Sequence, residues 1–219
     1  MTKRSQIPKR WLIVVILTLG AAIFAITPYV PLDSSYSRVT ISTSFTLHYP
    51  LLLTHIFSSF IALVIGWLQF LPTLRKTRPH IHRIIGRIYL SLVAIGGITG
   101  IVVGMYTDSY IRQMSFLTLV LLWLYTGWKG YTTARNRNFN AHRKWMIRNY
   151  AVTLVAATAR LVTPICILIY LVANQTEPFT SVEAVLKHVL EVNIWVGLVV
   201  NIVISEWLFI SPSKNTHNH

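Results

Sequence analysis

Long apolar stretches alternate with short polar segments along the whole chain. The apolar stretches are residues 11–30, 51–71, 84–103, 115–128, 151–172 and 192–210. Most of them approach the ~20 residues that a helix needs to cross a hydrocarbon core about 30 Å thick. Backbone amides in lipid must bond within their own segment, and these stretches show no alternation of polar and apolar residues, so they must be helices. The pattern predicts an all-α integral membrane bundle of six transmembrane helices.

The composition supports a membrane protein with one polytopic domain. Hydrophobic residues make up 53% of the 219 residues and charged residues 12%, and the mean hydropathy is +0.55, far from the averages of soluble proteins. We expect a single domain over residues 1–219, with a core at 51–172 and flanking helices at 11–30 and 192–210. The loops leave no room for a soluble catalytic domain, and the sequence contains no phosphate loop or nucleotide-binding fingerprint. The single Cys166 allows neither a disulfide framework nor a CxxC pair.

The placement of lysine and arginine predicts the orientation. Basic residues gather before residue 11 and within 73–87 and 129–148, whereas the alternate loops 31–50, 107–113 and 173–191 carry only Arg38, Arg112 and Lys187. By the positive-inside rule both termini are cytoplasmic, in the plasma or inner membrane. The first apolar stretch exceeds the core of a typical signal peptide, so we expect it to be retained as an anchor. We also expect a short amphipathic helix on the outer surface at 181–190.

The net charge of +14 does not require a nucleic-acid partner. The positive charge is spread over the inner loops in the way that the positive-inside rule alone produces. Anionic lipid head groups of the inner leaflet are therefore the expected partners of most of these side chains. The sequence leaves open whether the chain forms a homo-oligomer.

One local pattern occurs twice, each time where a basic segment meets an apolar stretch. Its residues are His82, Arg83, Arg87 and Tyr89 in the first copy, and His142, Arg143, Arg148 and Tyr150 in the second. The stretches before and after each copy form two hairpins of the same orientation, which predicts parallel repeats related by an axis along the membrane normal. Such a core would bring both His-Arg corners together on the cytoplasmic side. The alternative is that these residues only anchor the helices at the membrane surface.

At these residues the chain resembles the bacterial predicted-membrane-protein family known as domain of unknown function 2306. The likeness rests on His55 in an apolar stretch, on HRIIGRIY at 82–89 and on AHRKWMIRNYAVTLVAATAR at 141–160. An additional His80 departs from the family pattern. The resemblance implies a membrane protein with several spans and supplies no activity, so the function must be argued from the site.

Two ionisable residues, His55 and Arg160, fall inside predicted helices, in the outer half of the bilayer. A buried arginine is costly in lipid and normally faces a partner or a water-filled cavity, so Arg160 is a candidate for function. His55 fits either a functional role or a core histidine bonded to a backbone carbonyl. We group both with Asn193 and Asn201 as an intramembrane polar site, although the asparagines fit helix packing equally well.

Residues at steps of four also indicate helix contacts. Gly96, Gly100 and Gly104 form a small-residue stripe that permits close packing. Glu206, near the inner end of the last stretch, is well placed to pair with an arginine of the two corners, or to remain solvated at the membrane surface.

Three classes of function remain, and the sequence leaves open whether the protein is an enzyme. The first is a haem-b-binding membrane oxidoreductase or electron carrier, with His82 and His142 as ligands of the metal and with cations for the haem propionates, namely Arg83, Arg87, Arg143 and Arg148. The second is a transporter or a lipid- or anion-binding protein, with the inner cationic corners as a head-group site and with His55 and Arg160 as its outer station. The third, an intramembrane zinc hydrolase, is disfavoured by the shortage of acidic ligands and the lack of an HExxH helix.

Overall fold

The computed structural model describes residues 9–174 and 181–210, and every regular element in this part of the chain is helical. The main helices are α1 Lys9–Ile26, α2 His48–Gly66, α3 Pro72–Thr77, α4 Pro79–Met105, α5 Tyr110–Arg135, α6 Phe139–Thr153, α7 Val155–Ala173 and α8 Val182–Ile204. Short helical turns are η1 Thr27–Tyr29, η2 Ser34–Tyr36, η3 Trp67–Phe70 and, with a wider π-type geometry, η4 Ser205–Ile210. The all-α prediction is confirmed for the described residues.

Four helical segments are long and apolar enough to cross a membrane: His48–Phe70, Pro79–Met105, Val155–Ala173 and Val182–Trp207. They correspond to the predicted stretches 51–71, 84–103, 151–172 and 192–210. The first predicted stretch retains a shorter apolar helix, Val15–Tyr29, within the described residues. The stretch 115–128 lies inside α5, which is 26 residues long but is not among the four. The multi-pass architecture is therefore confirmed, and the count of six remains a prediction.

Local sequence signals explain where these helices begin. Proline at the first positions of α3 and α4 has the backbone angle that a helix start requires, and it lacks the N–H that would be unpaired there. The side chain of Asn138 accepts a hydrogen bond from the Ala141 amide at 3.1 Å and caps α6. Because α4 and α6 start this early, both copies of the repeated pattern lie on helices rather than in loops.

The structure corrects two of the predicted boundaries. The separate surface helix at 181–190 is wrong, because Ser181 caps a helix that runs on unbroken to Ile204. No glycine or proline interrupts residues 182–196, so nothing ends the helix there. The stretch 151–172 is instead divided at Leu154, where α6 ends and α7 begins.

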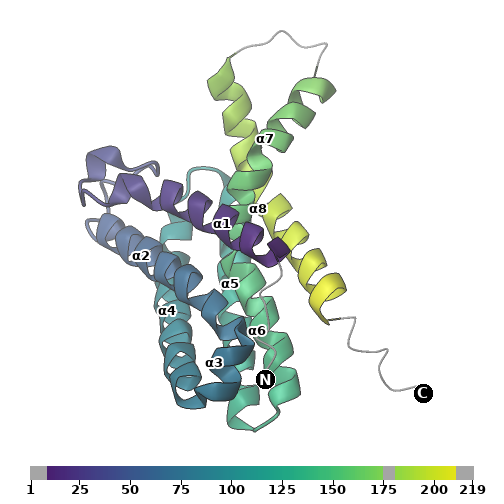
Figure 1. Ribbon diagram of the computed structural model, residues 1–219. Helices are drawn as coiled ribbons and strands as arrows, with labels where there is room; N and C mark the ends of the chain where they lie inside the picture. The colour runs from purple at the N-terminus through teal and green to yellow at the C-terminus, as the bar shows by residue number, and fades with distance from the viewer. Residues whose placement is uncertain (1–8, 175–180, 211–219) are drawn as a thin grey trace.

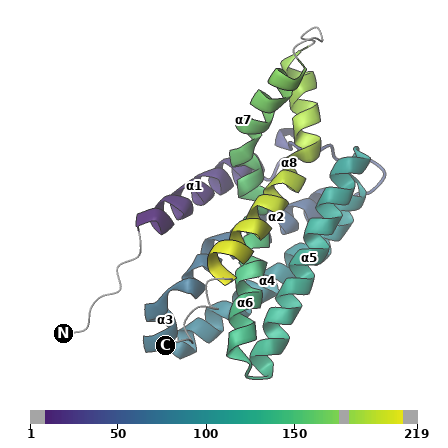
Figure 2. The ribbon, with the colours of Figure 1, turned by 90° about the vertical axis from the view of Figure 1, so that its right-hand side faces the viewer.

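The helices pack in chain order, α2 on α4, α4 on α5 and α5 on α6, while α7 packs mainly on α8 and α1. The return helix that packs on α5 is therefore α6 rather than α7. Figures 1 and 2 both show α3, the start of α4 and the α5–α6 turn at one end of the bundle, with the α7–α8 hairpin projecting past the other end. The two copies of the repeated pattern thus lie at the same end of the molecule.

Candidate functional site

A buried hydrogen-bond network fixes α4, α5 and α6 relative to one another. The Tyr89 hydroxyl donates to the Asn149 side-chain oxygen at 2.6 Å and lies 2.8 Å from the Thr153 hydroxyl. The Asn149 amide donates to the Trp123 carbonyl at 2.8 Å and to the Thr126 hydroxyl at 2.9 Å. The Trp123 indole donates to Thr153 at 2.8 Å. Tyr89 belongs to the first copy of the repeated pattern, and Asn149 stands between Arg148 and Tyr150 of the second copy. The network therefore connects the two hairpins.

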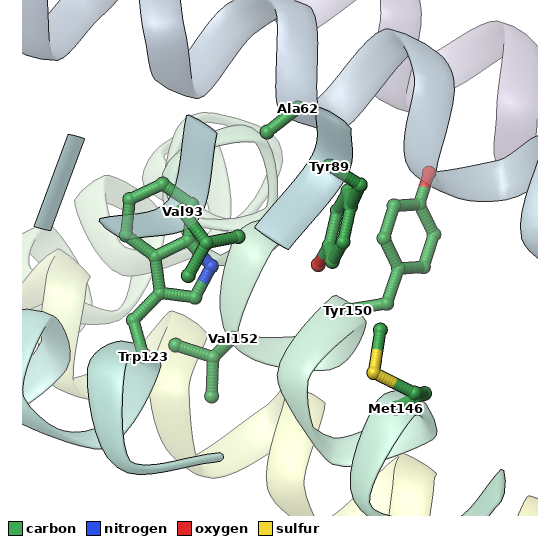
Figure 3. Close-up of a cluster of buried hydrophobic side chains, with 7 residues drawn as sticks. All are labelled: Ala62, Tyr89, Val93, Trp123, Met146, Tyr150 and Val152. Atoms are coloured by element: carbon green, nitrogen blue, oxygen red, sulfur yellow. The ribbon is translucent and has the colours of Figure 1, made fainter. Parts of the chain in front are cut away.

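The tyrosines of the two pattern copies meet in the core. Their ring centroids are 6.5 Å apart, and Figure 3 shows Tyr89 and Tyr150 side by side among the buried apolar side chains. The Tyr150 hydroxyl donates to the Leu63 carbonyl of α2 at 3.1 Å. Gly66 lies beneath both rings, since a Cβ atom there would sit 2.5 Å from the Tyr150 ring and 2.9 Å from the Tyr89 ring. These contacts set the spacing of α2, α4 and α6.

His142 is held through one ring nitrogen. Its Nδ1 lies 2.8 Å from the Gly130 carbonyl oxygen of α5. A carbonyl only accepts hydrogen bonds, so Nδ1 carries the proton and the neutral ring has its lone pair on Nε2. A histidine that binds a metal through one ring nitrogen usually donates a hydrogen bond from its other ring nitrogen.

His82 is held by Gln69, at the end of η3. With its amide nitrogen toward α4, Gln69 donates to the His82 Nδ1 at 3.0 Å and to the His82 carbonyl at 3.3 Å, and its oxygen accepts from the Gly86 amide at 3.3 Å. Because the His82 Nδ1 accepts this bond, the neutral ring carries its proton on Nε2. Gln69 and Gly130 therefore hold His82 and His142 in different tautomers.

His142 and Arg75 both act electrostatically on His82. His82 and His142 are 60 residues apart in sequence and lie at the end of the bundle where α4 and α6 begin. Both predicted ligands are therefore at the same end of the molecule. Arg83, Arg87 and Arg143 are exposed at this end.

Arg148 forms an ion pair with Glu206. Its Nε and Nη2 donate to the two carboxylate oxygens of Glu206 at 2.5 and 3.0 Å. This side-chain hydrogen bond raises the pKa of Arg148. The expectation that Glu206 pairs with a corner arginine is confirmed. Whether Arg148 also serves a haem propionate stays a prediction.

A groove with a volume of about 220 Å³ lies beside this ion pair, between α5, α6 and α8. Its lining combines aromatic, apolar and polar side chains, namely Leu122, Tyr125, Thr126, Trp145, Arg148, Val152, Ile202, Ser205 and Glu206. The Arg148 guanidinium lies 4.8 Å from the Trp145 ring centroid, and Tyr125 meets Trp145 edge to face at 5.7 Å. The sequence analysis missed Trp145, although its spacing of three from Arg148 on a helix was a usable signal.

The predicted intramembrane site is divided between different helix pairs. His55 has its Nδ1 2.7 Å from the Gly96 carbonyl, and its ring contacts Phe116 edge to face at 5.3 Å. A Cβ at Gly100 would lie 2.7 Å from the His55 ring, so the glycine stripe of α4 makes room for this histidine. Arg160 lies on α7 and is exposed, with a hydrogen bond to the Ala156 carbonyl at 2.6 Å. His55 and Arg160 therefore have different surroundings.

Asn193 and Asn201 connect α7 and α8. The Asn201 amide donates to the Ala151 carbonyl at 2.9 Å, and its oxygen accepts from the Thr158 hydroxyl at 3.0 Å. Asn193 donates to the Thr163 hydroxyl at 3.3 Å. Both asparagines are buried in these contacts, which favours the packing interpretation over a polar path.

Within residues 9–174 and 181–210, no three or more histidine, cysteine, aspartate or glutamate side chains gather closely enough to hold a metal ion. The zinc-hydrolase class, which needs three such ligands, gains no support from these residues.

Comparison with known proteins identifies the family and no activity. No curated protein and no solved structure matches the chain. The model of the family described as predicted membrane protein, DUF2306, matches residues 52–209, which include both copies of the repeated pattern. The chain therefore belongs to the DUF2306 family of predicted membrane proteins.

Proposed function

We propose that this chain is a haem-b-binding protein of the plasma membrane, with His82 and His142 as the two ligands of the iron. The observation that carries the proposal is the position of both histidines at the starts of α4 and α6, at the same end of the bundle, where His142 acts electrostatically on His82. Haem b bound by two histidines needs imidazoles on facing helices, with cations nearby for the propionates. The bound haem would supply one-electron redox chemistry.

The anchoring of His142 supports this assignment. His142 donates through Nδ1 to Gly130, which leaves Nε2 for a metal. Arg83, Arg87 and Arg143 are exposed at the same end of the bundle and are the cations proposed for the propionates.

We further propose six spans, with both termini in the cytoplasm and the two hairpins as parallel repeats. The 26 residues of α5 extend about 39 Å at 1.5 Å per residue, enough to cross the hydrocarbon core. α5 also connects the end of α4 to the start of α6, which lie at opposite ends of the bundle (Figure 2). With the basic loops inside, the paired histidines face the cytoplasm.

Absorption spectroscopy and iron analysis of detergent-purified protein from haem-replete cells test the proposal. We expect a Soret band and about one iron per chain, and we expect His82→Ala and His142→Ala each to lose both while the helical circular-dichroism signal is retained. His80→Ala is the matched control, because His80 is exposed and only two residues from His82. A wild-type protein without a Soret band or iron would refute the haem assignment, as would an equal loss in the control.

A second candidate is a site for an anionic lipid or other anion at the outer side. The charge of Arg38 acts electrostatically on Arg160, and the Arg38 guanidinium lies 4.4 Å from the Phe24 ring centroid. No acidic side chain of the described residues forms an ion pair with either arginine, so an anion from outside the chain would offset their repulsion.

The second candidate predicts that phosphatidylglycerol raises the unfolding temperature of the purified protein more than phosphatidylcholine does. Arg160→Gln should abolish this difference, and Arg137→Gln, which removes an exposed arginine at the opposite end, should preserve it. Equal stabilisation of wild type and Arg160→Gln would exclude the site.

A further inference from the structure

The groove between α5, α6 and α8 has no role in the haem proposal, and its shape and chemistry indicate a ligand of its own. It combines an ion pair, two aromatic rings and apolar walls on three helices. From these features we propose that the groove binds the six-membered ring of a membrane quinone, with the isoprenoid tail of the quinone in the surrounding lipid. The inference does not depend on whether the protein binds haem.

The size of the groove fits one substituted ring. A dry cavity of about 150 Å³ holds one benzene molecule, whereas pockets for drug-sized ligands measure about 300–1,000 Å³. The groove measures about 220 Å³, so it has room for a ring with its oxygen atoms and small substituents. A long tail must remain outside. Ile202 lines the groove and is 39% exposed on the outer surface of α8, where the groove can open toward lipid tails.

The charges of the groove favour a neutral head group. Arg148 and Glu206 already neutralise each other, and their side chains are 31% and 34% exposed. An anionic head group would add an uncompensated negative charge beside Glu206, whereas a quinone carries no net charge. Two of the five guanidinium N–H groups bond Glu206, which leaves three donors for a quinone carbonyl. The remaining lone pairs of the carboxylate can accept a hydrogen bond from a quinol hydroxyl.

The aromatic residues provide flat surfaces for the ring. Trp145 and Tyr125 both line the groove and contact each other edge to face, and aromatic pairs favour such edge-to-face or offset stacked arrangements. The Thr126 hydroxyl at the groove also belongs to the buried network through Asn149. The groove wall is therefore fixed by the same contacts that hold the helices together.

Calorimetric titration of the lipid-depleted, detergent-solubilised full chain with decylubiquinone, a short-tailed quinone, tests the inference. We expect saturable binding at one site per chain. Ile202→Trp should fill the groove and weaken binding at least about tenfold. Val203→Trp is the matched control, since Val203 is 42% exposed on the same helix and does not line the groove, and it should bind as wild type does.

A second variant tests the ion pair without filling the groove. Glu206→Gln keeps the shape of the side chain and removes its charge, so affinity for decylubiquinol should fall about tenfold. Glu183→Gln, at the exposed start of α8, should leave it unchanged. The inference is overturned if wild type shows no saturable binding, if Ile202→Trp binds as tightly as Val203→Trp, or if phosphatidylethanolamine displaces the quinone at equal concentration.

Discussion

Replacing Asn149 by alanine tests whether the buried network holds the two hairpins together. The Asn149 side chain is fully buried and makes three hydrogen bonds, to Tyr89, Trp123 and Thr126. Side-chain hydrogen bonds between membrane helices contribute about 0.6 kcal/mol each on average, so their loss costs about 2 kcal/mol. The void left by the amide adds about 1 kcal/mol. We expect Asn149→Ala to lower the free energy of unfolding by about 3 kcal/mol.

A double-mutant cycle measures the Tyr89–Asn149 hydrogen bond, which joins the two hairpins, separately from the other bonds of the network. Tyr89→Phe removes the hydroxyl that contacts Asn149 and Thr153 and should cost about 1 kcal/mol. Because the Tyr89–Asn149 bond is lost in either single variant, the double variant should cost about 0.6 kcal/mol less than the sum of the two.

The assay is reversible unfolding in mixed micelles with increasing sodium dodecyl sulfate, followed by circular dichroism. Asn140→Ala is the control, since Asn140 is an exposed residue of the same helix. If Asn149→Ala lies within about 0.5 kcal/mol of this control, the range of ordinary surface substitutions, the network does not stabilise the fold as argued.

Three further substitutions test the close contacts between helices. Gly66→Ala should destabilise the protein by about 1–3 kcal/mol, since its Cβ would lie 2.5 Å from the Tyr150 ring. Gly20→Ala is the control: it lies within α1 with nothing within 4 Å, so it should not destabilise the protein in the same unfolding titration. Gly197→Ala should loosen α8 from α7, because a Cβ would lie 3.1 Å from the backbone nitrogen of Ala159 in α7. Faster hydrogen exchange confined to these two helices would verify this effect. Glu206→Ala should cost about 1 kcal/mol after allowing for the partial exposure of the ion pair, and an unchanged unfolding free energy would contradict a structural role for this pair.

Much of the helical framework followed from local sequence. The lengths of the apolar stretches identified the four membrane-crossing segments, because the hydrocarbon core fixes how many apolar residues a span needs. The prolines that start α3 and α4 are likewise local signals. The break at Leu154 had no such signal, since no glycine or proline stands there.

The candidate site could be predicted only in part. The repetition of the His-Arg pattern correctly placed His82 and His142 at the same end of the bundle, where α4 and α6 begin (Figure 1). The choice of Arg148 as the partner of Glu206 could not be predicted, since the two residues are 58 apart in sequence and their distance depends on how α8 crosses α6. Gln69 was overlooked, although it is a polar residue within an apolar stretch.

The sequence alone thus determined which segments are helical, which of them suit lipid, and which residues repeat, because each of these depends on neighbours along the chain. Only the tertiary structure decided that Arg148 bonds Glu206, that His55 bonds Gly96 rather than meeting Arg160, and that a groove opens beside α8. These contacts depend on the rotation and crossing of each helix, which side-chain packing throughout the bundle sets jointly.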